Sequence, residues 1–276
     1  MRISIRVVML LVIVALMSDV AGAYQRSDRS RQVRELVEAA AAGETSKVLQ
    51  ILKSGINVNA TFAGEDSELS GQTALMAAAS RGHSGLVEEL IKRGANVNLK
   101  LRSGRTALMS AAGSGDEATI KALIRAGADV NATVVSHHAG ELTPLVITIN
   151  TDHPQRFQIV RILLAAKAEV NPKGRFLMSP LMQALEDLEM VKLLLAHGAD
   201  VNQKNFRGAT PLMGAVVTRN AAVVKYLIEK GADVKARDQD GYTALMLAER
   251  EETMLDAEER GEIIKVLKRV EAGLKP

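Results

Sequence analysis

A nine-residue stretch that returns at a fixed interval constrains this chain more than any other feature. Residues 71–79 read GQTALMAAA, and residues 104–112, which begin 33 positions later, read GRTALMSAA. The same interval of 33 separates GATPLM at residues 208–213 from GYTALM at residues 241–246. A fixed internal period of this size indicates stacked supersecondary units, each packed against its neighbours. The chain of 276 residues is therefore predicted to form a single solenoid.

Each unit carries the signals for two helices joined by a turn. Thr73 precedes the first helix of the second unit and can cap its free N–H groups, while Ala or Pro at the next position suits the first turn. Gly82 is expected to make the turn between the helices. The second helix has apolar residues at positions i, i+3 and i+4. Gly94 and Gly127 are expected to end second helices in a left-handed conformation, before the chain enters a hairpin finger.

The asparagine that leads out of each unit marks the register of the array. It occurs at Asn59, Asn98, Asn131, Asn171 and Asn202, and Lys235 stands in its place in the sixth unit. The first interval of 39 residues predicts an elongated acidic finger at residues 61–70. The interval of 40 predicts additions at residues 134–142 and 150–156, which make the fourth unit irregular. The interval of 31 that follows predicts a short fifth unit.

Over residues 32–272 these units resemble the ankyrin repeat family; four units match closely and three in part. The resemblance implies an all-α solenoid of about seven helix-turn-helix repeats with β-hairpin fingers, in which the first and last repeats are caps. It also implies a non-catalytic scaffold without cofactors that binds another protein. In this family, contacts come mainly from the fingers and from the exposed side of the first helix, on the concave face.

Carried over to matching positions, the resemblance nominates twelve contact residues. They are Arg81, Lys100, Arg102, Ser103, Arg105, Ser114, Phe206, Arg207, Gln239, Asp240, Tyr242 and Arg250. Phe206 and Tyr242 are the first choices, because exposed aromatic residues and arginine often dominate protein interfaces. The net charge of +3 comes from charges of mixed sign without a basic block, so nucleic acid is not expected as a partner. We expect a monomer that binds its partner stoichiometrically.

The chain departs from the ankyrin pattern at the residue after Thr-Pro-Leu, where the family usually has His. Methionine occupies this place at Met76, Met109, Met182, Met213 and Met246. The hydrogen bonding of that His is therefore absent, and packing is expected to hold the start of the helix. A methionine series can also bind soft metals such as Cu(I). One methionine per repeat at a helical position favours core filling instead.

Composition and motifs argue against catalysis. Aromatic residues make up 3% of the chain and Trp is absent, which argues against an aromatic-lined ligand pocket. The sequence contains no GxxxxGK[ST], HExxH or EF-hand motif. His137, His138 and His153 fall in the additions to the fourth unit, and imidazole is a common metal ligand. A metal or small-ligand carrier that uses these histidines is the alternative; exposed loop histidines are favoured, and no metal site is assigned.

The N-terminus has the pattern of a secretory signal. Residues 1–23 contain two arginines, an apolar run at residues 7–17 and the small residues Ala-Gly-Ala at residues 21–23. The apolar run is about half the roughly 20 residues that a membrane-spanning helix needs. Cleavage would leave a flexible lead-in at residues 24–31; an uncleaved anchor is the alternative. A solenoid without cysteine suggests a bacterial periplasmic protein, and a secreted effector that binds a host protein is the other destination.

Overall fold

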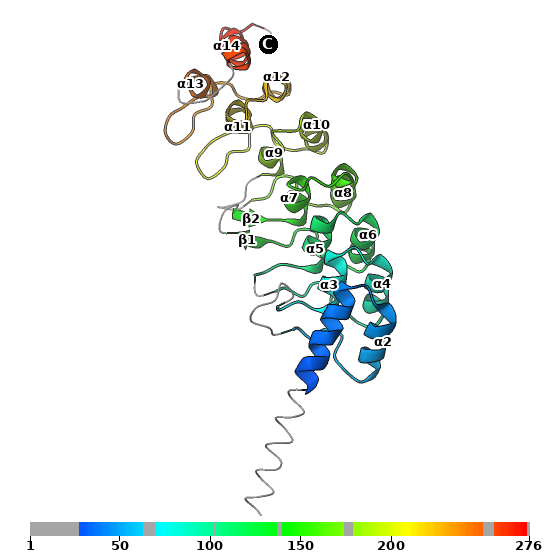
Figure 1. Ribbon diagram of the computed structural model, residues 1–276. Helices are drawn as coiled ribbons and strands as arrows, with labels where there is room; N and C mark the ends of the chain where they lie inside the picture. The colour runs from blue at the N-terminus through cyan, green and yellow to red at the C-terminus, as the bar shows by residue number, and fades with distance from the viewer. Residues whose placement is uncertain are drawn as a thin grey trace, which may run out of the picture.

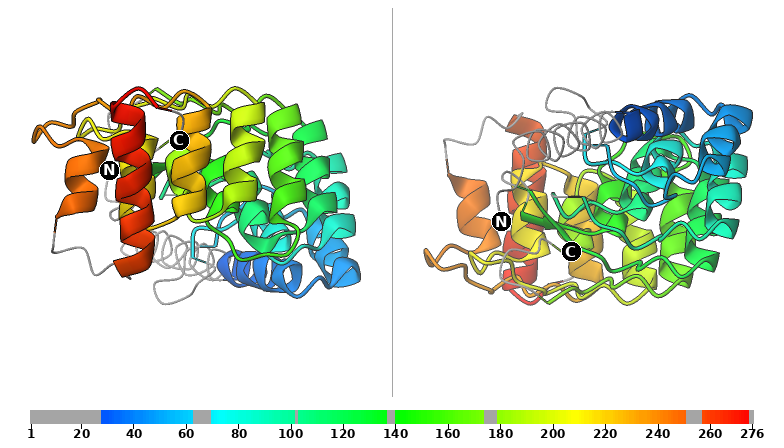
Figure 2. Two further views of the ribbon diagram at one scale, coloured as in Figure 1. Left: turned by 90° about the horizontal axis from the view of Figure 1, so that it is seen from above. Right: turned by 90° about the horizontal axis from the view of Figure 1, so that it is seen from below.

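The computed structural model describes residues 28–62, 70–101, 103–136, 140–173, 179–250 and 257–274. The export signal predicted at residues 1–23 lies outside these ranges, as do Arg102, His137, His138 and most of the first finger. The described helices stack as pairs in two layers, with loops that project as fingers on one side (Figure 1). Figure 2 shows the N-terminal helix and the C-terminal helix at opposite ends of this stack.

The inner helices follow a capping Thr or Ser. They are α3 (Ala74–Ser80), α5 (Ala107–Ser114), α7 (Pro144–Ile149), α9 (Pro180–Gln183), α11 (Pro211–Val217) and α13 (Ala244–Glu249). The outer helices are α2 (Thr45–Lys53), α4 (Ser84–Lys92), α6 (Glu117–Arg125), α8 (Arg156–Ala165), α10 (Leu188–Ala196), α12 (Ala221–Glu229) and α14 (Ala257–Glu271). A helix at residues 28–41 precedes α2 and completes the first of seven pairs in the described chain. It already includes residues 28–31, which the sequence places in the lead-in. None of the helices described is both long and apolar enough to span a membrane.

Packing runs along each layer, as the repeat pattern predicts. In the inner layer, α3 contacts α5, α5 contacts α7, and the series continues through α9 and α11 to α13. Within each pair the inner helix also packs on its outer partner, as α3 does on α4. Alanines make the inner layer close: Ala77, Ala78 and Ala79 are fully buried in α3. The predicted all-α solenoid of seven helix pairs is confirmed.

Buried threonines begin the inner helices. Thr73 accepts a hydrogen bond at Oγ1 from the N–H of Met76 at 3.3 Å, and Thr106 does the same for Met109. The same bond recurs at the start of the other inner helices, where the acceptor is the side-chain oxygen of Thr143, Ser179, Thr210 or Thr243. A polar side chain inside the core is tolerated because it satisfies an N–H group that the helix itself leaves free.

The methionine series fills the core in the middle of the array and not at its end. Met76, Met109 and Met213 are buried, and Met182 is half-buried. Met213 also accepts a hydrogen bond at Sδ from the N–H of Thr210 at 3.4 Å, so its thioether closes a capping box. The expectation of core filling is wrong for Met246, which is 42% exposed. Helix α13 is the last inner helix described, so no further inner helix packs over its methionine.

The register asparagines join each finger to the next repeat. The side chain of Asn98 donates from Nδ2 to the carbonyl of Gly127 at 2.9 Å, and its Oδ1 accepts the N–H of Asp129 at 2.8 Å. The other four asparagines make the same two bonds, at Asn59, Asn131, Asn171 and Asn202. Lys235 has no acceptor atom in its side chain, so it cannot continue this pattern.

Left-handed backbone occurs where the sequence predicts it. Gly94 and Gly127 have φ of +83° and +84°, which confirms the predicted helix ends. Two other residues adopt this conformation without being glycine. Lys167 (φ +70°) takes the corresponding place after α8, and Arg219 (φ +64°) takes the place of the turn glycine between α11 and α12. A side chain with a Cβ is strained in this region of φ.

The first addition to the fourth repeat forms a β-hairpin. Strand β1 (Val134–Ser136) pairs antiparallel with β2 (Gly140–Leu142), and Val134 lies opposite Leu142. Among the fingers that the structure describes, this is the one that forms strands. It projects from the finger side of the stack at the level of α7 (Figure 1).

Candidate interaction surface

The fingers and the exposed side of the inner helices share one face of the solenoid. The layer of outer helices bends toward the finger side, which makes that side concave (Figure 1). In four repeats the seventh residue after the capping threonine is exposed, namely Gly113, Asn150, Val217 and Arg250, whereas Ser80 at this position is half-buried. A partner that lies in the concavity would therefore contact the fingers and these positions together.

Two arginine–aromatic pairs lie on the concave face of repeats six and seven: three of their residues are on the fingers, and Arg250 is at the C-terminal end of α13. The guanidinium carbon of Arg207 lies 5.7 Å from the centroid of the Phe206 ring, and that of Arg250 lies 5.0 Å from the Tyr242 ring. Phe206 is 53% exposed, Tyr242 is half-buried, and both arginines are exposed. Cation–π attraction holds each arginine along its ring. These four residues and Gln239 are together called the C-terminal finger cluster.

Gln239 joins the two fingers. Its backbone N–H donates to the carbonyl of Arg207 at 2.9 Å, and its side-chain Nε2 donates to the carbonyl of Phe206 at 3.0 Å. Gly208 permits this approach, because a Cβ on it would lie 3.2 Å from the Gln239 nitrogen. Asp238 shapes the second finger by accepting the N–H groups of Asp240 and Tyr242, which leaves Asp240 exposed at the tip. The cluster is therefore ordered before any partner arrives.

Cations on these fingers and on the outer helices have different partners. Lys204 donates to the carbonyl of Arg237 at 3.2 Å, and Arg237 donates to the carbonyl of Gly241 at 2.6 Å. On the outer helices, in contrast, arginines pair with carboxylates. Arg93 lies 3.0 Å from Glu89, and Arg125 lies 3.0 Å from Glu88. No described carboxylate forms an ion pair with these finger cations, whereas ion pairs neutralise much of the positive charge on the outer helices.

The predicted contact residues of repeats two and three form a separate group. Arg81, Lys100, Ser103 and Arg105 are exposed, and the Arg105 guanidinium lies over Gly113 of α5. Ser114 is half-buried instead, and its hydroxyl donates to the carbonyls of Ala79 and Ala111, at 3.2 and 3.0 Å. Its hydroxyl therefore joins α5 to α3. Repeats four and five separate this group from the C-terminal finger cluster (Figure 1).

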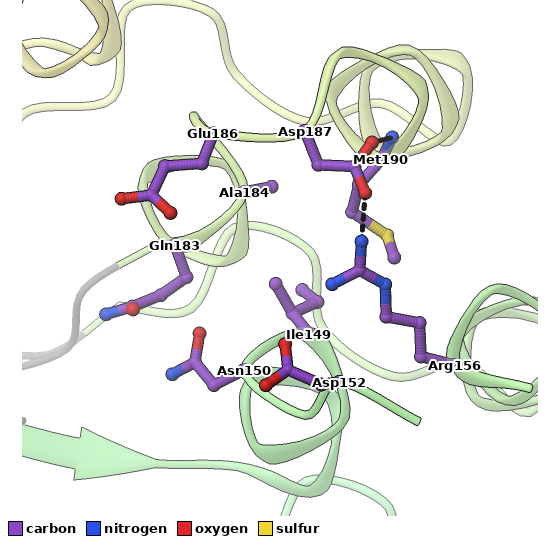
Figure 3. A pocket seen from close by; sticks show the side chains of 9 residues that line it. All are labelled: Ile149, Asn150, Asp152, Arg156, Gln183, Ala184, Glu186, Asp187 and Met190. Atoms are coloured by element: carbon purple, nitrogen blue, oxygen red, sulfur yellow. Dashed lines mark hydrogen bonds and ion pairs between the residues drawn. The ribbon is translucent and has the colours of Figure 1, made fainter. Parts of the chain in front are cut away.

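A cavity of about 370 Å³ lies between these two groups, where repeat four meets repeat five. Its lining comes from the ends of α7 and α9 and from the start of α8 and α10. Figure 3 shows Asn150, Gln183 and Glu186 on one side of it, and the ion pair of Arg156 with Asp187 on the other. Asn150 is one of the exposed seventh residues, so the cavity borders the concave face.

Comparison with known proteins agrees with this architecture. The family model described as ankyrin repeats in three copies matches residues 36–134, 135–205 and 181–272. The chain belongs to the ankyrin repeat family. Such arrays mediate protein–protein interaction and are typically non-catalytic.

Solved ankyrin structures superpose on most of the chain. The human ASB11 ankyrin repeat domain has a TM-score of 0.66 at 26% identity, over 84% of this chain and 96% of that one. The ankyrin repeat domain of Bcl-3, a member of the IkappaB family, has a TM-score of 0.67 at 25% identity, over 85% and 97%. No curated protein sequence gives a significant match.

One of the three histidines considered as metal ligands is described. The ring of His153 lies over Gly115 of the preceding repeat, and its Nδ1 accepts the N–H of Gln155 at 3.2 Å. His83 lies on Gly43 in the same way, so this is a packing contact between consecutive repeats of the ankyrin array. The two additions to the fourth repeat join opposite ends of α7: β2 leads into the N-terminal end of this helix, and His153 follows its C-terminal end. The described residues contain no group of three side chains suited to hold a metal ion.

Three features of this surface are not predictable from the repeat pattern. The pattern identifies Gln239 as a contact residue, but its role in joining the fingers depends on a contact between repeats that no sequence motif encodes. The exposure of Met246 follows from its place in the last inner helix. The cavity had a partial signal, since the interval of 31 residues indicated a shortened fifth repeat.

Proposed function

We propose that this ankyrin array is a non-catalytic scaffold that binds one protein partner on its concave face, with the C-terminal finger cluster as the main contact. The observation that carries the proposal is the pair of solvent-accessible arginine–aromatic contacts: Phe206–Arg207 lies on one finger, and Tyr242, on the finger joined to it, stacks with Arg250 at the end of α13. Aromatic residues and arginine contribute most to many interfaces. Fingers that are already ordered also lose less conformational entropy on binding.

Three finger cations that form no ion pair with another described residue support a partner with acidic side chains opposite them. Lys204, Arg207 and Arg237 contact carbonyl groups or a ring in the part of the chain that the structure describes. Carboxylates of a partner can therefore pair with them without breaking an internal ion pair. Complementary charge of this kind mainly raises the association rate and the specificity.

The proposal is tested by affinity capture with the protein from residue 24 to 276. Capture uses the periplasmic extract of the native cell and compares the wild type with the double variant Phe206→Ala, Tyr242→Ala. We expect one dominant protein that the double variant loses while its melting temperature stays near that of the wild type. The control replaces an exposed apolar residue and a ring-stacked lysine away from the fingers, Leu274→Ala with Lys230→Ala. Equal capture by both double variants would place the interface elsewhere.

We also propose that the protein is exported, cleaved after Ala23 and active in a bacterial periplasm. The support is the charged, apolar and small-residue pattern of residues 1–23, together with the absence of cysteine. Cell fractionation followed by N-terminal sequencing tests this. A mature chain that begins at Tyr24 in the periplasmic fraction is expected. An intact signal in the membrane fraction would indicate an anchor, and recovery from the medium would indicate a secreted effector.

A further inference from the structure

The cavity between repeats four and five exists because the inner helix of repeat five is short. Helix α9 has four residues, whereas α3 and α11 have seven. The chain leaves α9 at Ala184 and reaches Asp187, the N-cap of α10, three residues later. The turn that would cover the end of α7 is therefore missing. A space of about 370 Å³ remains, which is at the lower end of the roughly 300–1,000 Å³ typical of ligand pockets.

The lining combines an apolar base with polar groups at the rim. Ile149, Ala184 and Met190 are buried and form the apolar part. Asp152 and Glu186 are exposed and place two carboxylates at the rim, together with the carboxamides of Asn150 and Gln183 (Figure 3). The cavity therefore offers acceptor oxygens around its opening and hydrocarbon behind them.

The only cation in the lining is already engaged within the described part of the protein. Arg156 pairs with Asp187, donates to the carbonyl of Thr151 at 3.5 Å, and lies over the Phe157 ring. Asp187 in turn accepts the N–H of Met190 at the start of α10. Neither the Asp152 nor the Glu186 carboxylate hydrogen-bonds or pairs with another described residue. With the ion pair counted as neutral, the lining keeps two negative charges.

We propose that this cavity binds a guanidinium or primary ammonium group carried on a short apolar stem. The carboxylates of Asp152 and Glu186 would accept charge-assisted hydrogen bonds, and the stem would lie against Ile149 and Met190. A guanidinium is the better match, because its planar donors reach several acceptors at once. The cavity borders the concave face, so the cation is either a free small molecule or an arginine or lysine side chain of the bound protein.

Isothermal titration calorimetry with two probes tests the site and separates these sources. Butylguanidine represents a free cation, and the capped peptide acetyl-Gly-Arg-Gly-amide represents a protein side chain; the same peptide with citrulline in place of arginine is the neutral control. We expect saturable binding of the guanidinium probes and none of the citrulline peptide. Tighter binding of the peptide would favour a partner's side chain, and tighter binding of butylguanidine a free ligand.

Variants locate the binding in the cavity. The double change Asp152→Asn, Glu186→Gln should weaken it at least about tenfold, because each replaced carboxylate loses a charge-assisted bond. Glu229→Gln, an exposed residue of α12, is the matched control and should leave it unchanged. Equal binding by all variants, no binding of either guanidinium probe by the folded protein, or a response to Ca²⁺ alone would overturn the proposal. No protein partner enters these titrations, so their failure would leave the proposed scaffold function standing.

Discussion

The backbone N–H of Gln239 donates to the carbonyl oxygen of Arg207 at 2.9 Å and thereby joins the fingers of repeats six and seven. The bond also connects the two arginine–aromatic pairs. Arg207 and its neighbour Phe206 form one pair, and the Gln239 finger leads to Tyr242 of the other. The bond thus fixes the position of the two aromatic rings relative to each other. Loss of this bond should affect partner binding more than it affects the fold.

Gly208→Ala is predicted to disturb this junction, and Gly55→Ala in the first repeat is its control. Both glycines have left-handed backbone, with φ of +76° and +90°, so both substitutions should cost about 1 kcal/mol of folding free energy. At Gly208 the new Cβ also lies 3.2 Å from the Gln239 nitrogen, whereas nothing lies within 4 Å at Gly55. We expect similar chemical denaturation midpoints but weaker partner capture by Gly208→Ala. Equal capture would show that the junction does not order the site.

Local signals made most of the fold predictable. Helix caps and helix ends depend on residues a few positions apart, so a short stretch of sequence is enough to predict them. Examples are the caps at Thr73 and Thr106 and the left-handed ends at Gly94 and Gly127. The 33-residue period then places each unit on the next. Met246 shows the limit of this reasoning: a repeat pattern treats all units alike, whereas burial depends on whether another inner helix follows.

Gly94→Val is predicted to destabilise the protein by more than about 1 kcal/mol. No atom lies within 4 Å of the position that its Cβ would take, so the cost comes from the backbone at φ +83° and not from a steric clash with neighbours. Thermal melting of the purified variant measures it. Because the space is open, Gly94→Ala should be destabilised less than the β-branched variant. An unchanged melting temperature in Gly94→Val would contradict the assignment of a left-handed helix end.

The candidate site was predictable in position but not in organisation. Phe206 and Tyr242 could be nominated because each falls at a finger position set by the repeat. Their arginine partners and the Gln239 junction arise from contacts between side chains and between repeats, for which one sequence offers no pattern. The cavity beside Glu186 depends on how far α9 extends, and helix ends are the least certain part of any sequence-based prediction.

Lys167→Gly is predicted to stabilise the protein, in contrast to most substitutions. Lys167 has φ of +70° at a helix end where corresponding positions are Gly94, Gly127 and Gly231. Relief of this strain outweighs the extra chain entropy of glycine, for a net gain of up to about 1 kcal/mol. Lys92→Gly, in the last turn of α4, is the control and should lose up to about 1 kcal/mol. Denaturant unfolding compares them, and a loss of stability in Lys167→Gly would mean that its side chain makes a contact that offsets the strain.

Asn98→Ala is predicted to loosen the contact between repeats two and three. The substitution removes the bond from Nδ2 to the Gly127 carbonyl and the bond from the Asp129 N–H to Oδ1. Each is worth about 1 kcal/mol, and exposure to water reduces this, so we expect a loss of about 1–2 kcal/mol in denaturant unfolding. Asn57→Ala, which removes one bond within its own loop, to the N–H of Asn59, should lose about half as much. If the two variants unfold alike, the asparagines shape their own loops and do not link repeats, because only the inter-repeat bonds distinguish these substitutions.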